Sequence, residues 1–329
     1  MPCGSHRNRL RFRWLLAICA FLAPVTFQSC FTGIESTPKI SESDLRRESR
    51  ASRPEVTYLD GITGEPPSLW HAGKFWTVTD PRSERVFGIN LDGSEISFTG
   101  ISEVVSITGS PEAIISFDSP AGRVSYRTDI SADSLMRRRD FAIPYAVENS
   151  VVDAVRSRLA GNRYYITTSL WNDASGNSVR GLKYIPVEVV DVSAGRGVYP
   201  LRLSLSYEVP VAGVKSAPGH VKPGDSTHRY FNLAMAAPGS VGGATHAFPD
   251  FFSLTDPRKR YPKIEDKAWA NIIAGRVGEG MTRDECRLAL GSPANISRHA
   301  GYSELREIWT YDEGIRLVFI DGLLTSAYR

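Results

Sequence analysis

An Asp-Gly pair near the end of the chain, Asp321-Gly322, separates two short apolar segments. This dipeptide between β-prone segments is the strongest short-range indication of a β-hairpin, because both residues accept the positive φ angles of a tight turn. A second turn signal, at residues 312–314, separates the first of these segments from another apolar stretch. The pattern predicts three consecutive strands, at residues 307–311, 315–320 and 323–328.

Two short helices are predicted before these strands. Large apolar residues recur at helical spacing within residues 267–277, and two glycines follow. The second helix begins at a capping box, in which Thr282 and Glu285 each accept the other's backbone N–H. It ends before Gly291, where we expect a left-handed C-cap, and Pro293 follows. Two helices that cover one face of a three-stranded meander give a small ααβββ domain with two layers.

These residues resemble the BamE-like family, also called SmpA/OmlA. The landmarks are, in order, Gly-Met-Thr at 280–282, Leu-Gly-x-Pro at 290–293, Trp-x-Tyr at 309–311 and Phe-x-Asp-Gly-x-Leu at 319–324. The resemblance covers residues 265–329 and implies a small binding scaffold of envelope lipoproteins. In the outer-membrane barrel assembly machinery, such a domain is an accessory subunit that contacts partner proteins and lipid. This chain is far longer than that subunit, so the resemblance implies a fold and not that specific role.

The N-terminus has the layout of a secretory signal peptide. Four arginines precede an apolar run at residues 14–23, which is too short to cross a bilayer as a helix. The following residues resemble the lipobox of bacterial lipoproteins, with Ser29 and Cys30 matching and with Phe27 and Gln28 departing from it. The resemblance implies that Cys30 is acylated and becomes the first residue of the mature chain. The alternative is an ordinary cleaved signal with an incidental cysteine.

The cysteine content favours an acyl anchor over a disulfide. After removal of residues 1–29, only Cys30 and Cys286 remain. Acyl chains on Cys30 explain this cysteine without a partner, whereas nothing in the sequence motivates a disulfide to a helical residue. Phe31 is not the aspartate that retains lipoproteins at the inner membrane in some bacteria. We therefore expect attachment to membrane lipid in the cell envelope, at the outer membrane.

The charge balance argues against a nucleic-acid partner. The chain has 39 Lys and Arg residues against 36 Asp and Glu residues, but four of the arginines lie at positions 7–13. Without the signal peptide the net charge is close to neutral, so no basic field attracts a polyanion. The remaining length, about 300 residues, predicts two or three domains.

The sequence between the anchor and the C-terminal domain is first polar and then β-rich. Residues 30–54 are rich in Ser, Glu and Arg, and they predict a solvated tether. Residues 55–145 and 146–262 predict one or two small barrel- or sandwich-like units. Within the second unit, residues 208–250 are rich in Gly, Pro and Ala and predict a long loop. With the C-terminal domain at residues 263–329, the chain is predicted to be an α+β protein.

Several segments of the β-rich region have strand patterns. Leucines at positions 201, 203 and 205 alternate with polar residues, which is the period of a half-buried strand. Residues 164–168 and 184–190 are strand-like by composition. Pro186 argues for an edge position or a bulge in the latter segment.

Some of these strings recur at a spacing of 88 residues. Residues 72–79 align with residues 160–167, and residues 75–82 align with residues 251–258, which lie twice that spacing further along the chain. The equal spacing favours two related β-units, with the third match leading out of them. Coincidence among short β-turn strings is the alternative.

One set of side chains permits a metal-site hypothesis. His220, Asp225, His228 and His246 lie in the predicted long loop, and loops can converge on a metal. Zinc ligands are usually paired at short spacing, whereas the gaps between these histidines are 8 and 18 residues. We therefore favour solvated loop histidines, and we expect neither a metal nor a cofactor.

No string in the sequence predicts catalysis. A nucleophile elbow, a phosphate-binding loop and a His-Glu-x-x-His string are all absent from the sequence. Cys286 lies on the apolar face of a capped helix, so a buried small hydrophobe is the expected role. Asp60, Asp80 and Glu84 have no catalytic spacing, and we expect them to be solvated surface carboxylates.

The sequence thus predicts a lipid-anchored protein without enzymatic activity. It would bind an envelope protein as a scaffold, through sheet or helix edges of the C-terminal domain, in outer-membrane assembly or maintenance. A glycan- or peptidoglycan-binding protein is one alternative, and it requires exposed, clustered aromatic residues at Trp70, Trp76 and Trp171; core positions are the commoner environment for such residues. A metal-dependent envelope hydrolase is the other alternative, and it requires the three histidines to converge.

Overall fold

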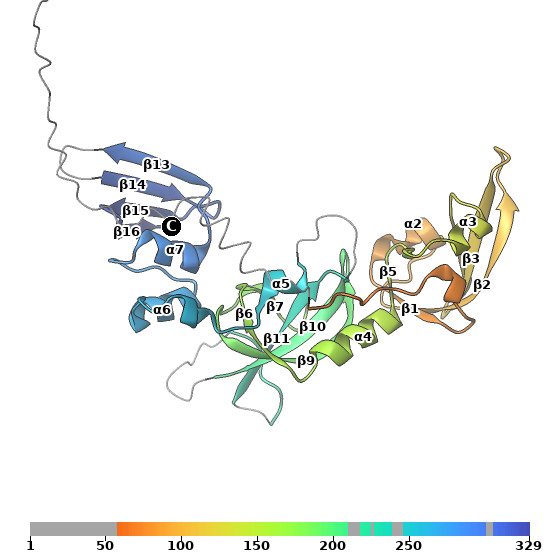
Figure 1. Cartoon of the computed structure of the whole chain (residues 1–329), viewed down its shortest axis with the longest axis horizontal. Coiled ribbons are helices and arrows are strands. Elements are labelled where there is room, and N and C mark those ends of the chain that lie inside the picture. Colours follow the sequence, from red (N-terminus) through yellow and green to blue (C-terminus); the bar gives the residue numbers. More distant parts are fainter. Residues whose placement is uncertain (1–57, 210–217, 225–226, 239–245, 301–304) are drawn as a thin grey trace, which may run out of the picture. The chain divides into compact units, whose positions relative to one another are not determined.

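The computed structural model describes residues 58–209, 218–224, 227–238, 246–300 and 305–329 (Figure 1). These residues form three antiparallel sheets of five, seven and four strands, each with its own cluster of buried apolar side chains. The chain is an α+β protein rich in β-structure, as the sequence predicts. The predicted signal peptide, Cys30 and the tether lie outside the described residues.

The first sheet has the space order β4-β3-β2-β1-β5. Its strands are β1 (Phe75–Val78), β2 (Glu95–Val105), β3 (Pro111–Ser119), β4 (Gly122–Arg127) and β5 (Ala146–Glu148). One short helix, η1 (Pro67–Leu69), precedes β1, and three others lie between strands: η2 (Pro81–Ser83), α2 (Glu84–Phe87) and α3 (Ala132–Met136). The period-2 alternation of a strand places Ile96 and Phe98 of β2 on the same face, where they pack with Trp76 and Phe117.

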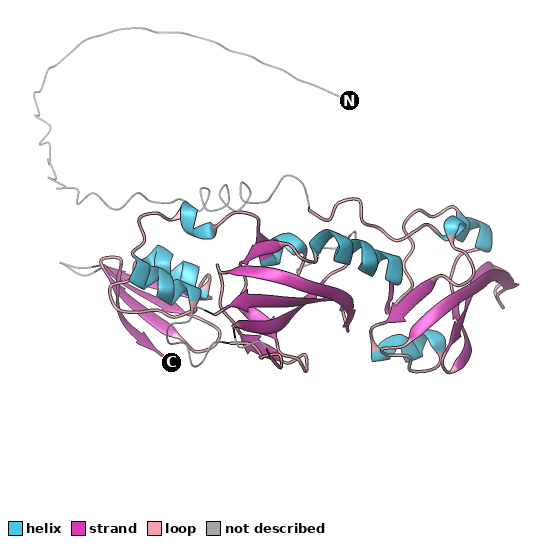
Figure 2. Ribbon diagram, turned by 90° about the horizontal axis from the view of Figure 1, so that it is seen from below, coloured by secondary structure: helices cyan, strands magenta, loops and turns pink. Residues whose placement is uncertain are grey.

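The second sheet curls into a half-barrel (Figure 1). Its elements are α4 (Asn149–Leu159), β6 (Arg163–Ile166), β7 (Leu170–Asn172), β8 (Ser178–Arg180), β9 (Pro186–Arg196), β10 (Tyr199–Glu208), β11 (His228–Met235), α5 (Phe248–Phe251) and β12 (Phe252–Ser253). The space order is β12-β6-β9-β10-β11-β7-β8. The predicted alternation in β10 is confirmed, because Leu201, Leu203 and Leu205 are fully buried. Figure 2 shows α4 along this sheet, and its buried face shares the same core.

The prediction of a long loop at residues 208–250 is wrong. β11 lies within this segment and pairs with β10 along its whole length, from Glu208↔His228 to Leu201↔Met235. Its side chains alternate, and Phe231, Leu233 and Met235 are buried. The Gly- and Pro-rich sequence on both sides masks this short period-2 pattern.

Pro186 lies at the start of an interior strand. It is the first residue of β9, which runs between β6 and β10, so the predicted edge position is wrong. The alternative prediction, a bulge in this segment, is confirmed: Ser204 pairs with Asp191 and Leu205 pairs with Val189, so Val190 of β9 is the extra residue. A proline at the first residue of a strand interrupts the hydrogen-bond ladder least, because it lacks only one terminal donor.

The third sheet has one strand more than predicted. The C-terminal elements are η3 (Pro257–Arg260), α6 (Asp266–Ile273), α7 (Arg283–Leu290), β13 (Asn295–Ala300), β14 (Leu305–Thr310), β15 (Arg316–Ile320) and β16 (Leu323–Tyr328). β14, β15 and β16 correspond to the three predicted strands, and β13 adds a fourth that pairs with β14 in continuous register. β13 escapes prediction because it reads Asn-Ile-Ser-Arg-His-Ala, with no apolar alternation.

The helix ends follow the sequence signals in part. The predicted capping box is present at α7, where Thr282 Oγ1 accepts from Glu285 N and Glu285 Oε2 accepts from Thr282 N at 2.8 Å. Gly291 is not in the expected left-handed helical conformation, since its φ is 89° but its ψ is −170°. α6 ends at Ile273, earlier than predicted, because Gly275 with φ 62° provides the positive-φ position just beyond it.

The strings that recur at 88 residues have similar local structure. β1 and β6 share one pattern of exposure, and both Asp80 and Asp256 cap a 3-10 helix by accepting from the backbone N–H two residues later. The surrounding strands differ, because β1 lies between β2 and β5, whereas β6 lies between β12 and β9. The likeness is therefore local, and a repeat of whole units stays a prediction.

Gly291→Ala is expected to destabilise a protein of residues 30–329 by about 1–3 kcal/mol. The combination of φ 89° and ψ −170° is open essentially to glycine alone, while no atom lies within 4 Å of the added Cβ, so the cost is backbone strain. The matched control is Gly100→Ala, which also meets no atom within 4 Å but has an ordinary φ. Urea unfolding of both variants measures the difference, and equal stabilities would contradict the strain argument.

Candidate functional site

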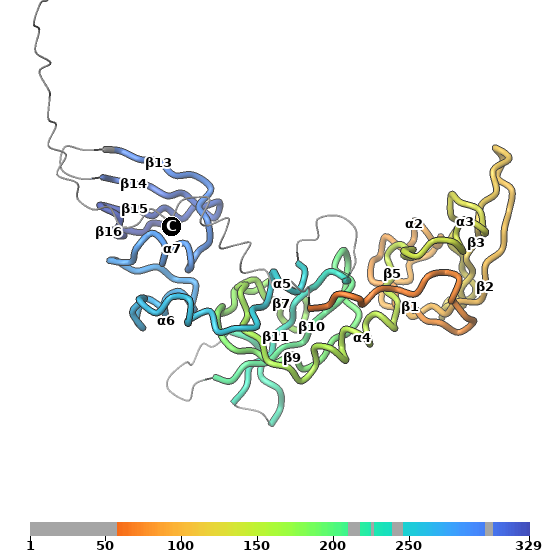
Figure 3. The backbone as a smooth tube through the Cα atoms, viewed as in Figure 1, coloured from red at the N-terminus to blue at the C-terminus, as the bar shows by residue number. Residues whose placement is uncertain are grey.

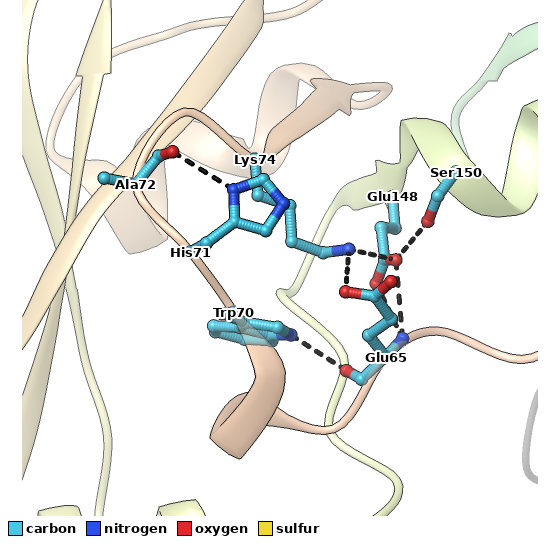
Figure 4. A network of polar contacts seen from close by, with 7 residues as sticks. All are labelled: Glu65, Trp70, His71, Ala72, Lys74, Glu148 and Ser150. Atoms are coloured by element: carbon cyan, nitrogen blue, oxygen red, sulfur yellow. Dashed lines mark hydrogen bonds and ion pairs between the residues drawn. The ribbon is translucent and has the colours of Figure 1, made fainter.

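A buried lysine, Lys74, lies at the centre of a polar network in the first sheet. Its Nζ is 2.7 Å from Glu65 Oε2 and 2.7 Å from Glu148 Oε1. The side chains of Lys74 and Glu148 are each 6% exposed, whereas Glu65 is partly solvated. Figure 4 shows the ammonium group between the two carboxylates. One ammonium against two carboxylates leaves the network with one excess negative charge.

Three segments that are distant in sequence hold these groups. Lys74 immediately precedes β1, Glu148 ends β5, and Glu65 lies in the loop before η1. Glu148 Oε2 also accepts from the backbone N–H of Glu65 at 3.1 Å, and Ser150 Oγ donates to Glu148 Oε1. The indole of Trp70 donates to the Glu65 carbonyl at 2.8 Å. The network therefore fixes the loop before η1 against the end of β5 (Figure 4).

The chemistry of this network is structural. Removing an ammonium and a carboxylate from water is costly, and only close pairing with further hydrogen bonds offsets the cost. Both oxygens of Glu148 are engaged, and Lys74 faces two carboxylates, so the groups of the network serve as mutual partners that hold their segments together. Among the described residues, no three His, Cys, Asp or Glu side chains form a group able to hold a metal ion.

No sequence motif marks this network. Glu65, Lys74 and Glu148 belong to residue types that ordinarily lie at the surface, and their spacing corresponds to no known site. Their proximity arises from the pairing of β1 with β5, which brings Trp76 opposite Glu148. A long-range strand pairing of this kind leaves no local pattern to detect.

The residues of the metal-site hypothesis fall in different surroundings. His220 packs against Tyr230, and the ring centroid of His246 lies 4.2 Å from that of Tyr199. Asp225 lies outside the described residues. Since no metal-binding group of three or more ligand side chains exists in the described ranges, the convergence that a hydrolase requires is not found there.

The three tryptophans of the glycan-binding alternative are buried. Trp70 and Trp76 meet edge to face, with ring centroids 4.9 Å apart, in the core of the first sheet. Trp171 stacks on Phe231 with centroids 3.6 Å apart in the core of the second sheet. These side chains form packing contacts, as expected for core positions, and they leave no aromatic surface for a sugar ring.

The remaining candidates divide by burial. Asp60 and Glu84 are exposed, as predicted, but Asp80 is buried, and the prediction of a surface carboxylate is wrong there. Asp80 caps η2 and binds Arg82, whose hydrogen bonds hold the pKa of the carboxyl below its usual value. Cys286 is fully buried, and burial raises the pKa of its thiol to about 12, so the reactive thiolate is absent at neutral pH.

Cys30, the predicted lipidation residue, lies outside the described residues, so its contacts are not described. Within the described ranges, no helix combines the length and the hydropathy of a membrane span.

A second buried lysine, Lys183, lacks a carboxylate partner among the described residues. Its side chain is 7% exposed, and Nζ lies 5.3 Å from the ring centroid of Tyr184. Burial, with a smaller contribution from Arg180, lowers its pKa from 10.5 to about 8. Lys183 is therefore a charged group in a poorly solvated place at neutral pH.

A cavity of about 890 Å³ lies nearby, and its wall includes residues of the half-barrel. Apolar side chains such as Ile185 and Val187 line it together with Arg163 and Arg180. The volume is within the range of small-molecule sites. Arg163 pairs with Glu188 at 3.3 Å, and the wall also contains Arg180, Arg276 and Glu208, so charged groups of both signs line the cavity.

The outer edge of β16 is a candidate surface for protein binding. Leu323 and Leu324 are covered on this side, because Gly280 N donates to Leu324 O and Leu324 N donates to Met281 O, each at 2.8 Å. From Thr325 to Tyr328, no other strand of the described chain pairs with the outer edge. This edge strand contains no charged residue and exposes the ring of Tyr328.

The other edge strands of the described sheets are short or charged. β5, β8 and β12 have only three, three and two residues. β4 carries Arg123 and Arg127, and β13 carries Arg298. Short length and charge are the usual protection of a strand edge against pairing with another chain. β16 has neither form of protection.

Lys74→Met is expected to destabilise a protein of residues 30–329 by about 3–5 kcal/mol, because it leaves the carboxyl group of Glu148 buried and without its ammonium partner. Adding Glu148→Gln is expected to restore part of the loss. The control is Arg163→Met, which removes an exposed ion pair and is expected to cost about 0–1 kcal/mol. Chemical unfolding of the wild type, the two single variants and the double variant measures the free energy of unfolding of each. Equal losses of free energy for Lys74→Met and Arg163→Met would refute the role of burial.

Lys183→Met is expected to stabilise the chain by about 1–3 kcal/mol at pH 7, because the charged form of Lys183 is penalised by burial. The pKa of Lys183 is about 8 in the folded chain, against 10.5 for an ordinary lysine. Between these two pH values, the unfolded chain therefore holds a proton on Lys183 that the folded chain has lost. Wild-type stability therefore rises relative to the variant as pH increases from 8 to 10.5, and the advantage of the variant disappears above that range. Thermal melts of the wild type and of Lys183→Met from pH 7 to 10.5 measure the difference in stability between the two proteins. A difference that stays the same across this pH range would contradict the lowered pKa of Lys183.

No protein-family model, no curated protein and no solved structure matches the chain. The family to which residues 265–329 are expected to belong therefore stays a prediction. What is established is the fold class: an α+β chain with antiparallel sheets, one of them a half-barrel, and a four-stranded sheet at the C-terminal end.

Proposed function

We propose that this chain is a lipid-anchored protein of a bacterial cell envelope whose work is to bind another protein. The observation that carries the proposal is the outer edge of β16, residues 325–328, which has no charged residue and no partner strand within the described chain, although a register shift against β15 falls at Thr325. The unpaired N–H and C=O groups of such an edge accept an extended segment of a partner as an additional strand. The main-chain hydrogen bonds supply affinity, and the side chains beside the edge supply selectivity.

The N-terminal sequence supports the location. Four arginines, an apolar run at residues 14–23 and the pair Ser29-Cys30 form the pattern of a lipoprotein signal. Acyl chains on Cys30 would hold the body at the membrane, because each buried methylene contributes about 0.8 kcal/mol. We place the anchor in the outer membrane because Phe31 follows Cys30.

The order of the C-terminal elements supports a binding module. Helices α6 and α7 precede an antiparallel meander, which is the order expected from the resemblance of residues 265–329 to the BamE-like family. The sheet has a compact core around Trp309 and Phe319. A rigid core beneath an open edge keeps the edge extended, so a partner strand meets a preformed surface.

The alternatives lack the surfaces they need in the described residues. A glycan-binding function would use Trp70, Trp76 and Trp171, which are buried. A metal-dependent hydrolase would use a cluster of histidines, and the described residues hold no group of ligand side chains. Protein binding is therefore the function that we put forward for test.

A photo-crosslinking residue at Thr325 is expected to capture a partner protein in intact cells, whereas one at Ser297 of β13 is not. Ala327→Lys in the same chain is expected to lower the yield from Thr325 several-fold, because it adds a charge to the edge. Thr325 and Ala327 are exposed, but replacing Thr325 removes the hydrogen bond from its Oγ1 to Val318 O at 2.9 Å, so circular dichroism checks the fold of each protein. Equal capture from both edges, or a yield that Ala327→Lys does not change, would count against the outer edge of β16 as the binding surface.

A fatty-acid probe tests the anchor separately. It is expected to label the wild-type chain and not Cys30→Ala, and an unlabelled wild type would refute the anchor.

A further inference from the structure

The hairpin formed by β2 and β3 extends beyond the rest of its sheet. β1 pairs only with residues 95–97 of β2, and β4 pairs only with residues 114–119 of β3. Residues 104–112 therefore have no strand partner except each other, with Val104↔Glu112 and Val105↔Pro111 as the last pairs. Figure 3 shows this two-stranded arm reaching past the neighbouring strands of the first sheet.

The polar groups at the tip of the arm bond to one another. Ser106 N donates to Ser110 O at 2.8 Å, and Gly109 N donates to Ser106 O at 2.9 Å. Ser106 Oγ accepts from Ser110 N at 3.1 Å and lies 2.8 Å from Thr108 Oγ1. Gly109, with φ 82°, closes this turn. The turn therefore satisfies part of its own hydrogen-bonding capacity, while the backbone N–H groups of Ile107 and Thr108 make no hydrogen bond within the described chain.

The side chains at the tip are apolar and unusually exposed. Val105 is 72% exposed and Ile107 is 107% exposed, so the latter has no neighbour to cover it. No residue from 104 to 111 carries a charge. The charges at the base of the arm are occupied, because Glu103 accepts from Ala132 N and Glu112 pairs with Arg127.

We propose that this tip, residues 105–109, inserts into the surface of a lipid bilayer. A hydrocarbon environment penalises every unpaired polar group and every charge. The tip pairs several of its polar groups, carries no charge and exposes Val105 and Ile107, so these two side chains can enter the acyl boundary while the unpaired backbone groups stay among the hydrated headgroups. A protein that bound this tip would have no charged side chain to pair with, which favours lipid as the occupant.

The choice of a bilayer rests on the proposed anchor at Cys30. If Cys30 is acylated, the chain from Cys30 to Tyr58 can span at most about 95 Å even when fully extended, at about 3.4 Å per residue. The first described residues then stay within reach of the same membrane. The tip adds a second contact with the bilayer, made by the folded body itself.

Vesicle flotation of the mature chain with Cys30→Ala tests the tip without the anchor. We expect this protein to bind phosphatidylcholine vesicles weakly, and we expect Val105→Asp with Ile107→Asp to lower the partition coefficient roughly tenfold or more. Ile107→Trp is expected to raise it, because tryptophan favours the membrane interface. The matched control is Val198→Asp, an exposed valine at the turn between β9 and β10, which should bind as the parent does.

Three results would overturn the proposal. One is no binding of the parent protein to any vesicle, and another is an equal loss for the tip and Val198 variants. The third is binding only to vesicles that contain phosphatidylglycerol, with no effect of the tip variants, which would indicate attraction to exposed arginines instead. Circular dichroism of each variant checks the fold. The assay omits Cys30, so its failure is distinguishable from failure of fatty-acid labelling at that residue.

Discussion

The main constraint on the exposed surfaces of this chain is that each open sheet leaves unpaired backbone groups at its two edges. Every open antiparallel sheet leaves two outer strands whose N–H and C=O groups can pair with another chain. Here the outer strands β5, β8 and β12 are very short, and β4 and β13 carry arginines. β16 alone among the described outer strands is six residues long and uncharged. An exception of this kind is a surface that can be used for binding, since the same chain protects its other edges.

Local sequence patterns predict part of this fold well. The capping box at Thr282 and Glu285, the alternation of Leu201, Leu203 and Leu205, and the Asp-Gly turn all occur where the sequence places them. Each of these signals depends on neighbours in sequence. A few consecutive residues are enough to specify a cap or a turn, and the residues of one strand are enough to specify its alternation.

The elements that escape prediction depend on partners far along the chain. β11 is a strand because β10 pairs with it, and β13 is a strand because β14 pairs with it, although β13 has no apolar alternation. The network of Lys74 forms only after β1 and β5 come together. Propensity and pattern carry little information about such pairings, because the energy comes from cross-strand contacts and shared cores.

The two buried lysines show how environment separates similar residues. Lys74 faces two carboxylates at 2.7 Å, whereas Lys183 has an aromatic ring and a nearby arginine. The first arrangement compensates the loss of water, and the second compensates it less, which is why burial lowers the pKa of Lys183 to about 8. Lys74 therefore ties segments together, while Lys183 reduces stability at neutral pH.

The two proposed membrane contacts differ in scale. Acyl chains on Cys30 would supply nearly all of the binding energy, at about 0.8 kcal/mol for each buried methylene, whereas Val105 and Ile107 would add a few kcal/mol at most. A single flexible attachment leaves a body free to turn above the membrane, and a second contact limits that freedom. The hairpin tip would therefore contribute orientation more than affinity. Orientation matters for a strand edge such as β16, because pairing requires a partner to approach along the strand and in its plane.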